Sequence, residues 1–155
     1  MVTLEIQLRN CNEQDLRRIT EIEDLSFDDP YPYRLFVSFL LDFPEGFRVA
    51  VTEDKLIVGY CILSYSAKPG TLMISSIAVH PDFRQHGIGR ILLADSLKIA
   101  KELAALNQIK KIILQVALKN TPAQSLYREF GFQYSRKLPD YYGDGRDAMQ
   151  MELML

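Results

Sequence analysis

Two glycines lie where a strand-like run gives way to a long helical pattern. The run ends at Val79, a turn containing Arg84 follows, and Gly87 and Gly89 open the helix. Glycines let backbone N–H groups approach an anion closely, and the amino end of a helix carries partial positive charge. The segment therefore predicts a cradle for a phosphate or a pyrophosphate, to which Arg84 and Arg90 could add full charges. A tight strand-to-helix connection is the alternative role of these glycines.

Two residue patterns that bind particular phosphate ligands are absent from this glycine loop. A nucleoside-triphosphate loop needs a Gly-Lys pair, and the chain contains none. A dinucleotide fingerprint needs a third small residue, and Leu92 stands at that position. Both nucleotide-binding patterns are therefore excluded, and the rest of the sequence must indicate the ligand.

Two motifs together resemble the GCN5-related N-acetyltransferase (GNAT) superfamily. Arg84-x-x-Gly87-x-Gly89 after a strand matches its first signature, and the stretch from Asn120 through Tyr127 to Phe132 resembles the motif that follows it. The resemblance covers essentially the whole chain. The tail that begins at Tyr141-Tyr142 is similar to that of protein N-terminal α-amine acetyltransferases, which include ribosomal-protein alanine acetyltransferases and their archaeal relatives.

The resemblance implies an α/β GNAT fold, with a mixed sheet splayed between its fourth and fifth strands and about four flanking helices. It also implies acetyl-coenzyme A as the acetyl donor. In the family the pyrophosphate rests on the glycine loop, the pantetheine arm pairs with the preceding strand, and two side chains flank the thioester. The cofactor-binding residues carried over to this chain are Ile77, Ala78, Val79, Arg84, Gln85, His86, Gly87, Ile88, Gly89, Arg90, Asn120 and Tyr127.

Tyr127 is the expected general acid. In the family a tyrosine at this motif position protonates the leaving sulfur, and a phenol stays protonated at neutral pH. The alternative role is ordinary packing on its helix beside Leu126 and Phe130.

The general base is where the chain departs from the pattern of its relatives. Bacterial relatives carry a glutamate on the strand before Asn120, at the position of Gln115, and an amide cannot act as a base. Gln115 could orient a water molecule or simply pack. Archaeal relatives place an acidic residue between the first two helices, so Asp29 acting through ordered water is the expected base, and a turn cap is its alternative role. His80 and His86 belong to the phosphate-side turn, where a surface or phosphate contact is expected.

Four tyrosines are expected to bind the substrate. In the family, the loop between the first two helices and the loop between the last two strands wall the peptide groove, which points to Tyr31, Tyr33, Tyr141 and Tyr142. A tyrosine ring buries apolar area while its hydroxyl bonds a peptide group, although each could be an ordinary surface or core residue. An α-amine has a pKa of about 7.7–8.0 against about 10.4 for lysine, so it needs less help from a base.

Composition excludes several other classes of protein. The chain has 155 residues, 48% hydrophobic and 25% charged, which predicts one globular domain over residues 1–155. Its net charge of -2 disfavours nucleic-acid binding, which needs a basic surface. Cys11 and Cys61 form no zinc-binding pattern, so no metal is expected. No signal peptide or membrane span is indicated, and we expect a cytoplasmic protein.

Hydrophobic periodicity predicts the elements that position these residues. Strand-like runs cover 2–9, 46–52, 56–66, 71–79, 111–117, 132–138 and 147–154. Helical patterns run from an Asn12 cap to Leu25, over 33–42, over 87–106, and from a capping box at Thr121-Pro122-Ala123-Gln124 to just before Gly131. This order predicts a mixed sheet with helices on both faces.

Three functions are compatible with these residues. The leading one is transfer of acetyl from acetyl-coenzyme A to the α-amine of proteins or peptides, by direct attack on the thioester. The second keeps the donor and changes the acceptor to a lysine side chain, a polyamine or a small molecule. The third is a coenzyme A-binding regulatory module without catalysis, which the absent base at Gln115 would suit. No pattern in the chain specifies an oligomeric state.

Overall fold

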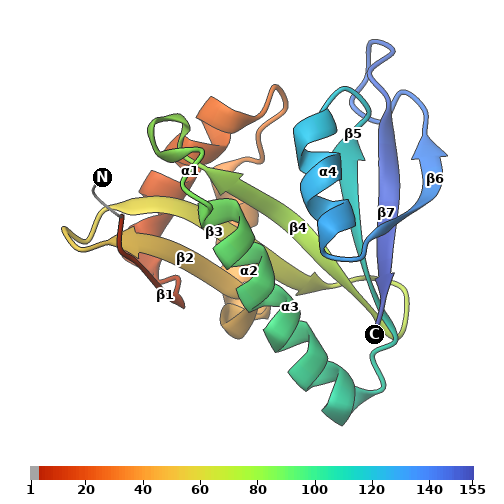
Figure 1. Ribbon diagram of the computed structural model, residues 1–155, viewed down its shortest axis with the longest axis horizontal. Helices are drawn as coiled ribbons and strands as arrows, with labels where there is room; N and C mark the ends of the chain where they lie inside the picture. Colours follow the sequence, from red (N-terminus) through yellow and green to blue (C-terminus); the bar gives the residue numbers. More distant parts are fainter. Residues whose placement is uncertain (1–3) are drawn as a thin grey trace. The chain divides into compact units, whose positions relative to one another are not determined.

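A computed structural model describes residues 4–155, which form seven strands, four α-helices and three short 3-10 helices (Figure 1). The strands are β1 (Ile6–Asn10), β2 (Phe47–Thr52), β3 (Ile57–Tyr65), β4 (Thr71–Val79), β5 (Lys111–Ala117), β6 (Gln133–Leu138) and β7 (Ala148–Met154). The helices are α1 (Leu16–Ser26), α2 (Tyr33–Asp42), α3 (Ile88–Asn107) and α4 (Thr121–Glu129), with 3-10 helices η1 (Glu13–Asp15), η2 (Pro44–Gly46) and η3 (Pro81–Phe83). The predicted order of strands and helices is confirmed. The start of the first predicted strand, residues 2 and 3, lies outside the described residues.

The sheet is mixed, as predicted. Its strands hydrogen-bond in the order β1-β2-β3-β4-β5-β7-β6. β4 and β5 run parallel, whereas β1–β2, β2–β3, β5–β7 and β6–β7 are antiparallel pairs. The parallel register joins Thr71–Ile74 to Lys111–Leu114, and the two strands continue beyond it to Val79 and Ala117. The paired stretch is therefore shorter than either strand.

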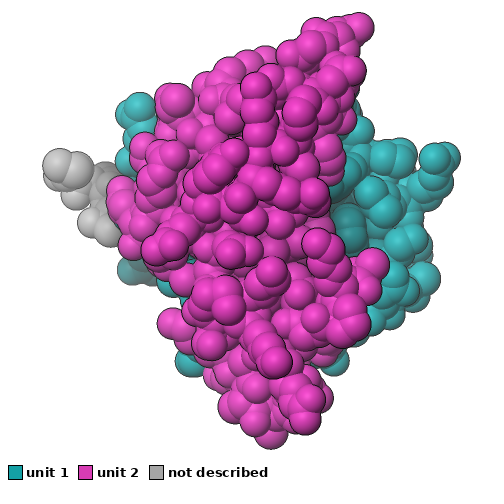
Figure 2. All heavy atoms as spheres, turned by 90° about the vertical axis from the view of Figure 1, so that its right-hand side faces the viewer, with its two compact units in different colours: residues 1–64, 76–99 teal, residues 65–75, 100–155 magenta. Residues whose placement is uncertain are grey.

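The chain divides into two compact units (Figure 2). Unit 1 comprises residues 1–64 and 76–99, and unit 2 comprises residues 65–75 and 100–155. Both β4 and α3 contribute residues to each unit. The expectation of one acetyltransferase domain over residues 1–155 stays a prediction.

Helices cover both faces of β2 and β3 in unit 1. On one face, Leu16, Ile19 and Ile22 recur at helical spacing along α1 and are at most 1% exposed. They join a buried cluster with residues of α2, β2 and β3. On the other face, a Cβ atom added to Gly59 would lie 3.0 Å from the Leu92 side chain, so a glycine here lets α3 approach β3 closely.

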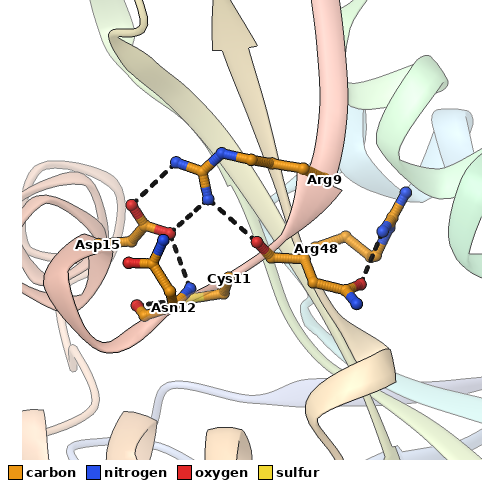
Figure 3. A network of polar contacts seen from close by, with 6 residues as sticks. Arg9, Cys11, Asn12, Asp15 and Arg48 are labelled. Carbon is orange, nitrogen blue, oxygen red and sulfur yellow. Dashed lines mark hydrogen bonds and ion pairs between the residues drawn. The ribbon is translucent and has the colours of Figure 1, made fainter.

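A charged network joins β1 to the start of α1 in unit 1 (Figure 3). The Arg9 guanidinium donates to both oxygens of the Asp15 carboxylate, at 2.7 and 3.0 Å, and the Asn12 N–H donates to the same carboxylate at 2.8 Å. Arg48 extends the network through a 2.7 Å bond to Oδ1 of Asn10. The predicted cap at Asn12 thus begins the short η1 helix, which leads directly into α1.

Unit 2 is built on β5, whose apolar run is buried as predicted. Ile112, Leu114 and Val116 are at most 5% exposed, and β5 pairs along its whole length with β7. Next to β7 lies β6, and α4 connects β5 to β6 (Figure 1).

The start of α4 differs by one residue from the predicted capping box. The side chain of Asn120, and not that of Thr121, accepts the Ala123 N–H at 3.3 Å. Gln124 instead turns back and donates to the carbonyl of Ala117 at 3.0 Å. Asparagine and threonine are both good helix caps, and here the Asn120 oxygen forms the cap one residue earlier than predicted. At the other end Gly131 has φ +98°, the left-handed conformation expected there.

Candidate active site

The site residues expected from the sequence are divided between the two units. Unit 1 carries Asp29, Tyr31, Tyr33 and residues 77–90, and unit 2 carries Gln115, Asn120, Tyr127, Tyr141 and Tyr142. Each unit therefore holds its own group of candidate side chains.

The glycine loop connects β4 to α3 in unit 1. Gln85 and Gly87 both adopt left-handed backbone conformations, with φ of 67° and 76°. Among the described residues 4–155, apart from Gly87 and its two chain neighbours, no atom lies within 4 Å of a Cβ built on Gly87, so open space adjoins the loop. The first helical hydrogen bond runs from Ile91 N–H to the Gly87 carbonyl at 3.1 Å. The N–H groups of Ile88 and Gly89 come before this bond, so the helix itself offers them no carbonyl acceptor.

These features fit a pyrophosphate group. The first turn of α3 supplies backbone donors and the partial positive charge of a helix amino end. The open space beside Gly87 leaves room for phosphate oxygens. The loop is thus suited to the diphosphate that the resemblance assigned to it, and the individual contacts of residues 84–90 stay predictions.

Arg84 shapes the turn before this loop. Its Nε donates to the Val79 carbonyl at 3.0 Å, and its Nη2 donates to Oγ of Ser26 at 3.3 Å. The motif arginine therefore connects the end of β4 to the last residue of α1. Its side chain is exposed, and its expected phosphate contact stays a prediction.

The two histidines of this region lie on either side of Arg84. His80 accepts the Asp82 N–H on its Nδ1 at 3.1 Å, and its ring meets Phe83 edge-on with centroids 5.9 Å apart. His80 is thus held by the η3 turn, whereas His86 is exposed in the glycine loop. Both positions fit the expected surface or phosphate-side role.

The segment between α1 and α2 carries the expected base and two expected substrate-binding tyrosines. Asp29 is exposed in a bend, and Tyr33 is 48% exposed at the start of α2. Tyr31 lies differently, because its ring packs against Phe36 and Phe39 with centroids 6.2 and 6.1 Å away. Tyr31 therefore anchors the segment to the core of unit 1, and Asp29 and Tyr33 are accessible.

Gln115 and two tyrosines form a cluster in unit 2. The Tyr141 hydroxyl donates to Oε1 of Gln115 at 2.5 Å, and the Tyr141 and Tyr142 rings meet edge-on with centroids 4.9 Å apart. Partial burial raises the pKa of the Tyr141 hydroxyl, which keeps its proton at neutral pH. Gln115 is thus a hydrogen-bond acceptor for a phenol.

The loop between β6 and β7 is held in shape by its own polar groups. The Asp140 carboxylate accepts the Gly145 N–H at 2.6 Å, and the Asp147 carboxylate accepts the Asp140 N–H at 2.7 Å. Arg146 donates to the Tyr142 carbonyl at 2.9 Å. This loop is ordered by local bonds that fix the backbone on both sides of the tyrosine pair.

Tyr127 lies on α4 and is 7% exposed. Its ring meets Phe132 edge-on, with centroids 6.0 Å apart. Asn120, expected beside the thioester, uses its side-chain oxygen to cap α4. The roles of both residues at the thioester stay predictions.

Glu23 is a buried polar residue of unit 1 that the motifs did not indicate. It is 2% exposed and accepts hydrogen bonds from the hydroxyls of Tyr60 and Ser76 and from the Tyr31 N–H. The sequence did contain a signal, because Glu23 stands two helical turns after Leu16 on the apolar face of α1.

The described residues 4–155 offer no group of three or more His, Cys, Asp and Glu side chains arranged to hold a metal ion. Over the same residues, no helix has both the length and the apolar character needed to cross a bilayer.

Comparison with known proteins identifies the class. The model of the acetyltransferase (GNAT) family matches residues 14–132, which is most of the chain. The chain therefore belongs to the GNAT family, and it is an acetyltransferase that uses acetyl-coenzyme A as donor.

Particular relatives are similar over nearly their full length. The N-alpha-acetyltransferase of Sulfurisphaera tokodaii is 34% identical, over 95% of this chain and 92% of that protein. The crystal structure of Ard1 from Thermoplasma volcanium superposes with a TM-score of 0.87 at 25% identity, covering 97% of both chains. The fold is also that of the ribosomal-protein-S18-alanine N-acetyltransferase from Escherichia coli, with a TM-score of 0.80, 23% identity, and 97% and 94% of the two chains covered.

Proposed function

We propose that this acetyltransferase modifies the N-terminal α-amine of proteins or peptides. The observation that carries the proposal is the hydrogen bond from Tyr141 to Gln115, at the strand position where bacterial relatives have a glutamate base. An amide oxygen that accepts a hydrogen bond from a phenol takes no part in removing a proton from an amine. Without a base, an acceptor amine that is already neutral reacts more readily. The lower pKa of α-amines makes their neutral form about 300-fold more abundant than that of a lysine side chain near pH 7.

The similarity to named N-alpha-acetyltransferases supports the same acceptor. The Sulfurisphaera tokodaii protein carries this name and aligns with almost the whole chain. A cytoplasmic location, where protein N-termini become available, belongs to the same proposal.

We assign the binding roles separately within each unit. In unit 1 the amides of Ile88 and Gly89 hold the pyrophosphate of the donor, and the backbone of Ile77–Val79 pairs with the amide-bearing pantetheine arm. The accessible Tyr33 in unit 1 and the Tyr141–Tyr142 pair in unit 2 contact the peptide that bears the amine.

The reaction needs one proton removed and one supplied. Acetyl-coenzyme A supplies an acyl group activated as a thioester. The neutral α-amine forms the new N–C bond as the C–S bond breaks, and the excess proton on nitrogen passes through water to the exposed carboxylate of Asp29. The Tyr127 hydroxyl donates a proton to the departing sulfur. Gln115 positions Tyr141 and does not transfer a proton.

Initial rates on paired peptides test the acceptor. One peptide carries an internal lysine and a free N-terminus, and its partner has the same sequence with a blocked N-terminus. We expect acetylation of the first peptide only. Reaction of the blocked peptide at an equal rate would assign the enzyme to lysine side chains, and faster reaction of a polyamine would assign it to small amines.

A further inference from the structure

The buried carboxylate of Glu23 has no place in the mechanism described above. It lies on the apolar face of α1 beside Ile19 and Ile22, and the residue is 2% exposed. Burying a carboxylate without partners is strongly unfavourable, so such a group is expected to be fully hydrogen-bonded. Among the described residues 4–155, no cationic side chain pairs with it.

The partners of Glu23 come from three separate segments of unit 1. Oε1 accepts the hydroxyl of Tyr60 on β3 and the hydroxyl of Ser76 on β4, the latter at 2.9 Å. Oε2 accepts the backbone N–H of Tyr31 at 2.9 Å. Burial, with Glu23 beside it, raises the pKa of Tyr60, so Tyr60 remains a donor.

The bond to Tyr31 fixes the chain between α1 and α2. A backbone N–H can only donate, so Oε2 of Glu23 is the acceptor of this bond. The Tyr31 ring meets Phe36 at 6.2 Å, and Phe36 in turn meets Tyr60 edge-on at 6.1 Å. The Glu23 side chain, the Tyr31 residue and the rings of Phe36 and Tyr60 therefore contact one another in a ring, which holds the segment in place.

This segment presents the accessible side chains of unit 1 assigned above to the acceptor. Asp29 precedes Tyr31 by two residues, and Tyr33 follows it by two. A shift of the Tyr31 backbone would displace both side chains together.

We propose that Glu23 is a positioning residue for the acceptor substrate: through the Tyr31 amide it holds the Asp29–Tyr33 segment in its binding conformation. The effect of Glu23 on peptide binding rests on the proposed function. Its restraint of the Asp29–Tyr33 segment does not. Loss of Glu23 weakens peptide binding and leaves donor binding unchanged.

Three substitutions on α1 separate this role from others. Glu23→Gln keeps a carbonyl oxygen for Tyr31 N–H, and its amide can donate to the hydroxyls of Tyr60 and Ser76. Glu23→Leu removes every acceptor. Asp24→Leu is the matched control, because Asp24 is an exposed acidic residue of the same helix.

The kinetic readout is the KM for each substrate. For Glu23→Leu we expect the KM for the peptide to rise about tenfold, the scale of one lost buried hydrogen bond to a charged group, with the KM for acetyl-coenzyme A unchanged. Glu23→Gln should restore the peptide KM to within about threefold of wild type. A collapse of kcat in Glu23→Gln with unchanged KM would overturn the proposal and mark Glu23 as a proton-transfer group. Equal changes in both KM values for Glu23→Leu would overturn it in favour of a purely structural role.

Hydrogen exchange at the Tyr31 amide tests the hold on the segment without any substrate. In the full chain labelled with ¹⁵N, we expect slow exchange in wild type and Glu23→Gln and fast exchange in Glu23→Leu. If Glu23→Leu does not fold, wild type and Glu23→Gln still decide, since exchange at the rate of an exposed loop amide in either would overturn the proposal. If wild type protects this amide but acetylates no N-terminal peptide, the proposed function fails and the hold on the segment stands.

Discussion

The hydroxyl of Tyr141 donates a hydrogen bond to Oε1 of Gln115 at 2.5 Å. This bond leaves the lone pairs of the Tyr141 oxygen directed away from Gln115, where they can accept an N–H group of a bound peptide. The edge-on contact with Tyr142 restrains the same ring. In the proposed function, Gln115 therefore positions the Tyr141 hydroxyl that is assigned to the peptide.

Removing either partner of this bond should have the same consequence. We expect Gln115→Leu and Tyr141→Phe each to raise the KM for a peptide about fivefold, with little change in the KM for acetyl-coenzyme A. In the double variant the effects should not add, and the coupling energy should be about 1 kcal/mol. Steady-state kinetics on the four proteins measures the cycle. Additive effects would mean that the hydrogen bond has no role in substrate binding.

The general-acid role of Tyr127 can be separated from its packing role by Tyr127→Phe. The ring contact with Phe132 should survive this change, so stability should hold. We expect kcat to fall about 100-fold, the usual contribution of a positioned proton donor, while affinity for coenzyme A is retained. Tyr134→Phe, an exposed tyrosine on β6 of the same unit, is the control. Parallel losses of affinity and rate in Tyr127→Phe would identify a packing residue.

The glycine loop offers a test with a well-matched control. Gly87 and Gly143 both have positive φ, 76° and 84°, and among the described residues neither would bring a Cβ within 4 Å of another atom. Alanine should therefore destabilise the fold by about 1–2 kcal/mol at either position, through backbone strain alone. Only Gly87→Ala should weaken coenzyme A binding in calorimetry, because only this loop is assigned to the pyrophosphate. Equal affinity in both variants would remove that assignment.

The ion pair between Arg9 and Asp15 predicts a pH-dependent contribution to stability (Figure 3). Burial favours the protonated carboxyl, but the bonds from Arg9 and the Asn12 amide outweigh it and lower the pKa of Asp15. A carboxyl with a lowered folded pKa stabilises the protein above its unfolded pKa, about 3.9, and loses this effect as the pH falls below it.

Asp15→Asn should reduce the free energy of unfolding by about 2 kcal/mol at pH 7. The difference from wild type should shrink near pH 3. Urea unfolding at the two pH values measures it, and Glu13→Gln, an exposed neighbour, is the control. A difference that is constant with pH would contradict the assigned pKa direction.

Most of the fold could be predicted from the sequence because its elements have strong periodic signals. The apolar run of β5 and the stripe of α1 allowed only one kind of element each, and the glycine at 131 marked the end of α4. The cap of α4 was misplaced by one residue, since Asn120 and Thr121 are both good caps and only the backbone conformation distinguishes them.

The candidate site was predictable only as far as its motifs extend. Gln115, Tyr141 and Tyr142 came from motif positions, and the structure brings them together. The network around Glu23 was missed because it joins residues far apart in the sequence, and no local pattern relates Glu23 to Ser76. Such long-range polar contacts depend on the packed core and have no short sequence signature.

The proposed acceptor is tested by the position of the acetyl group on one peptide that contains both a free N-terminus and a lysine. After partial reaction with acetyl-coenzyme A at neutral pH, fragment-ion mass spectrometry locates the modification. We expect acetyl on the α-amine with the lysine unmodified. Acetyl on the lysine, with the α-amine unmodified, would contradict it.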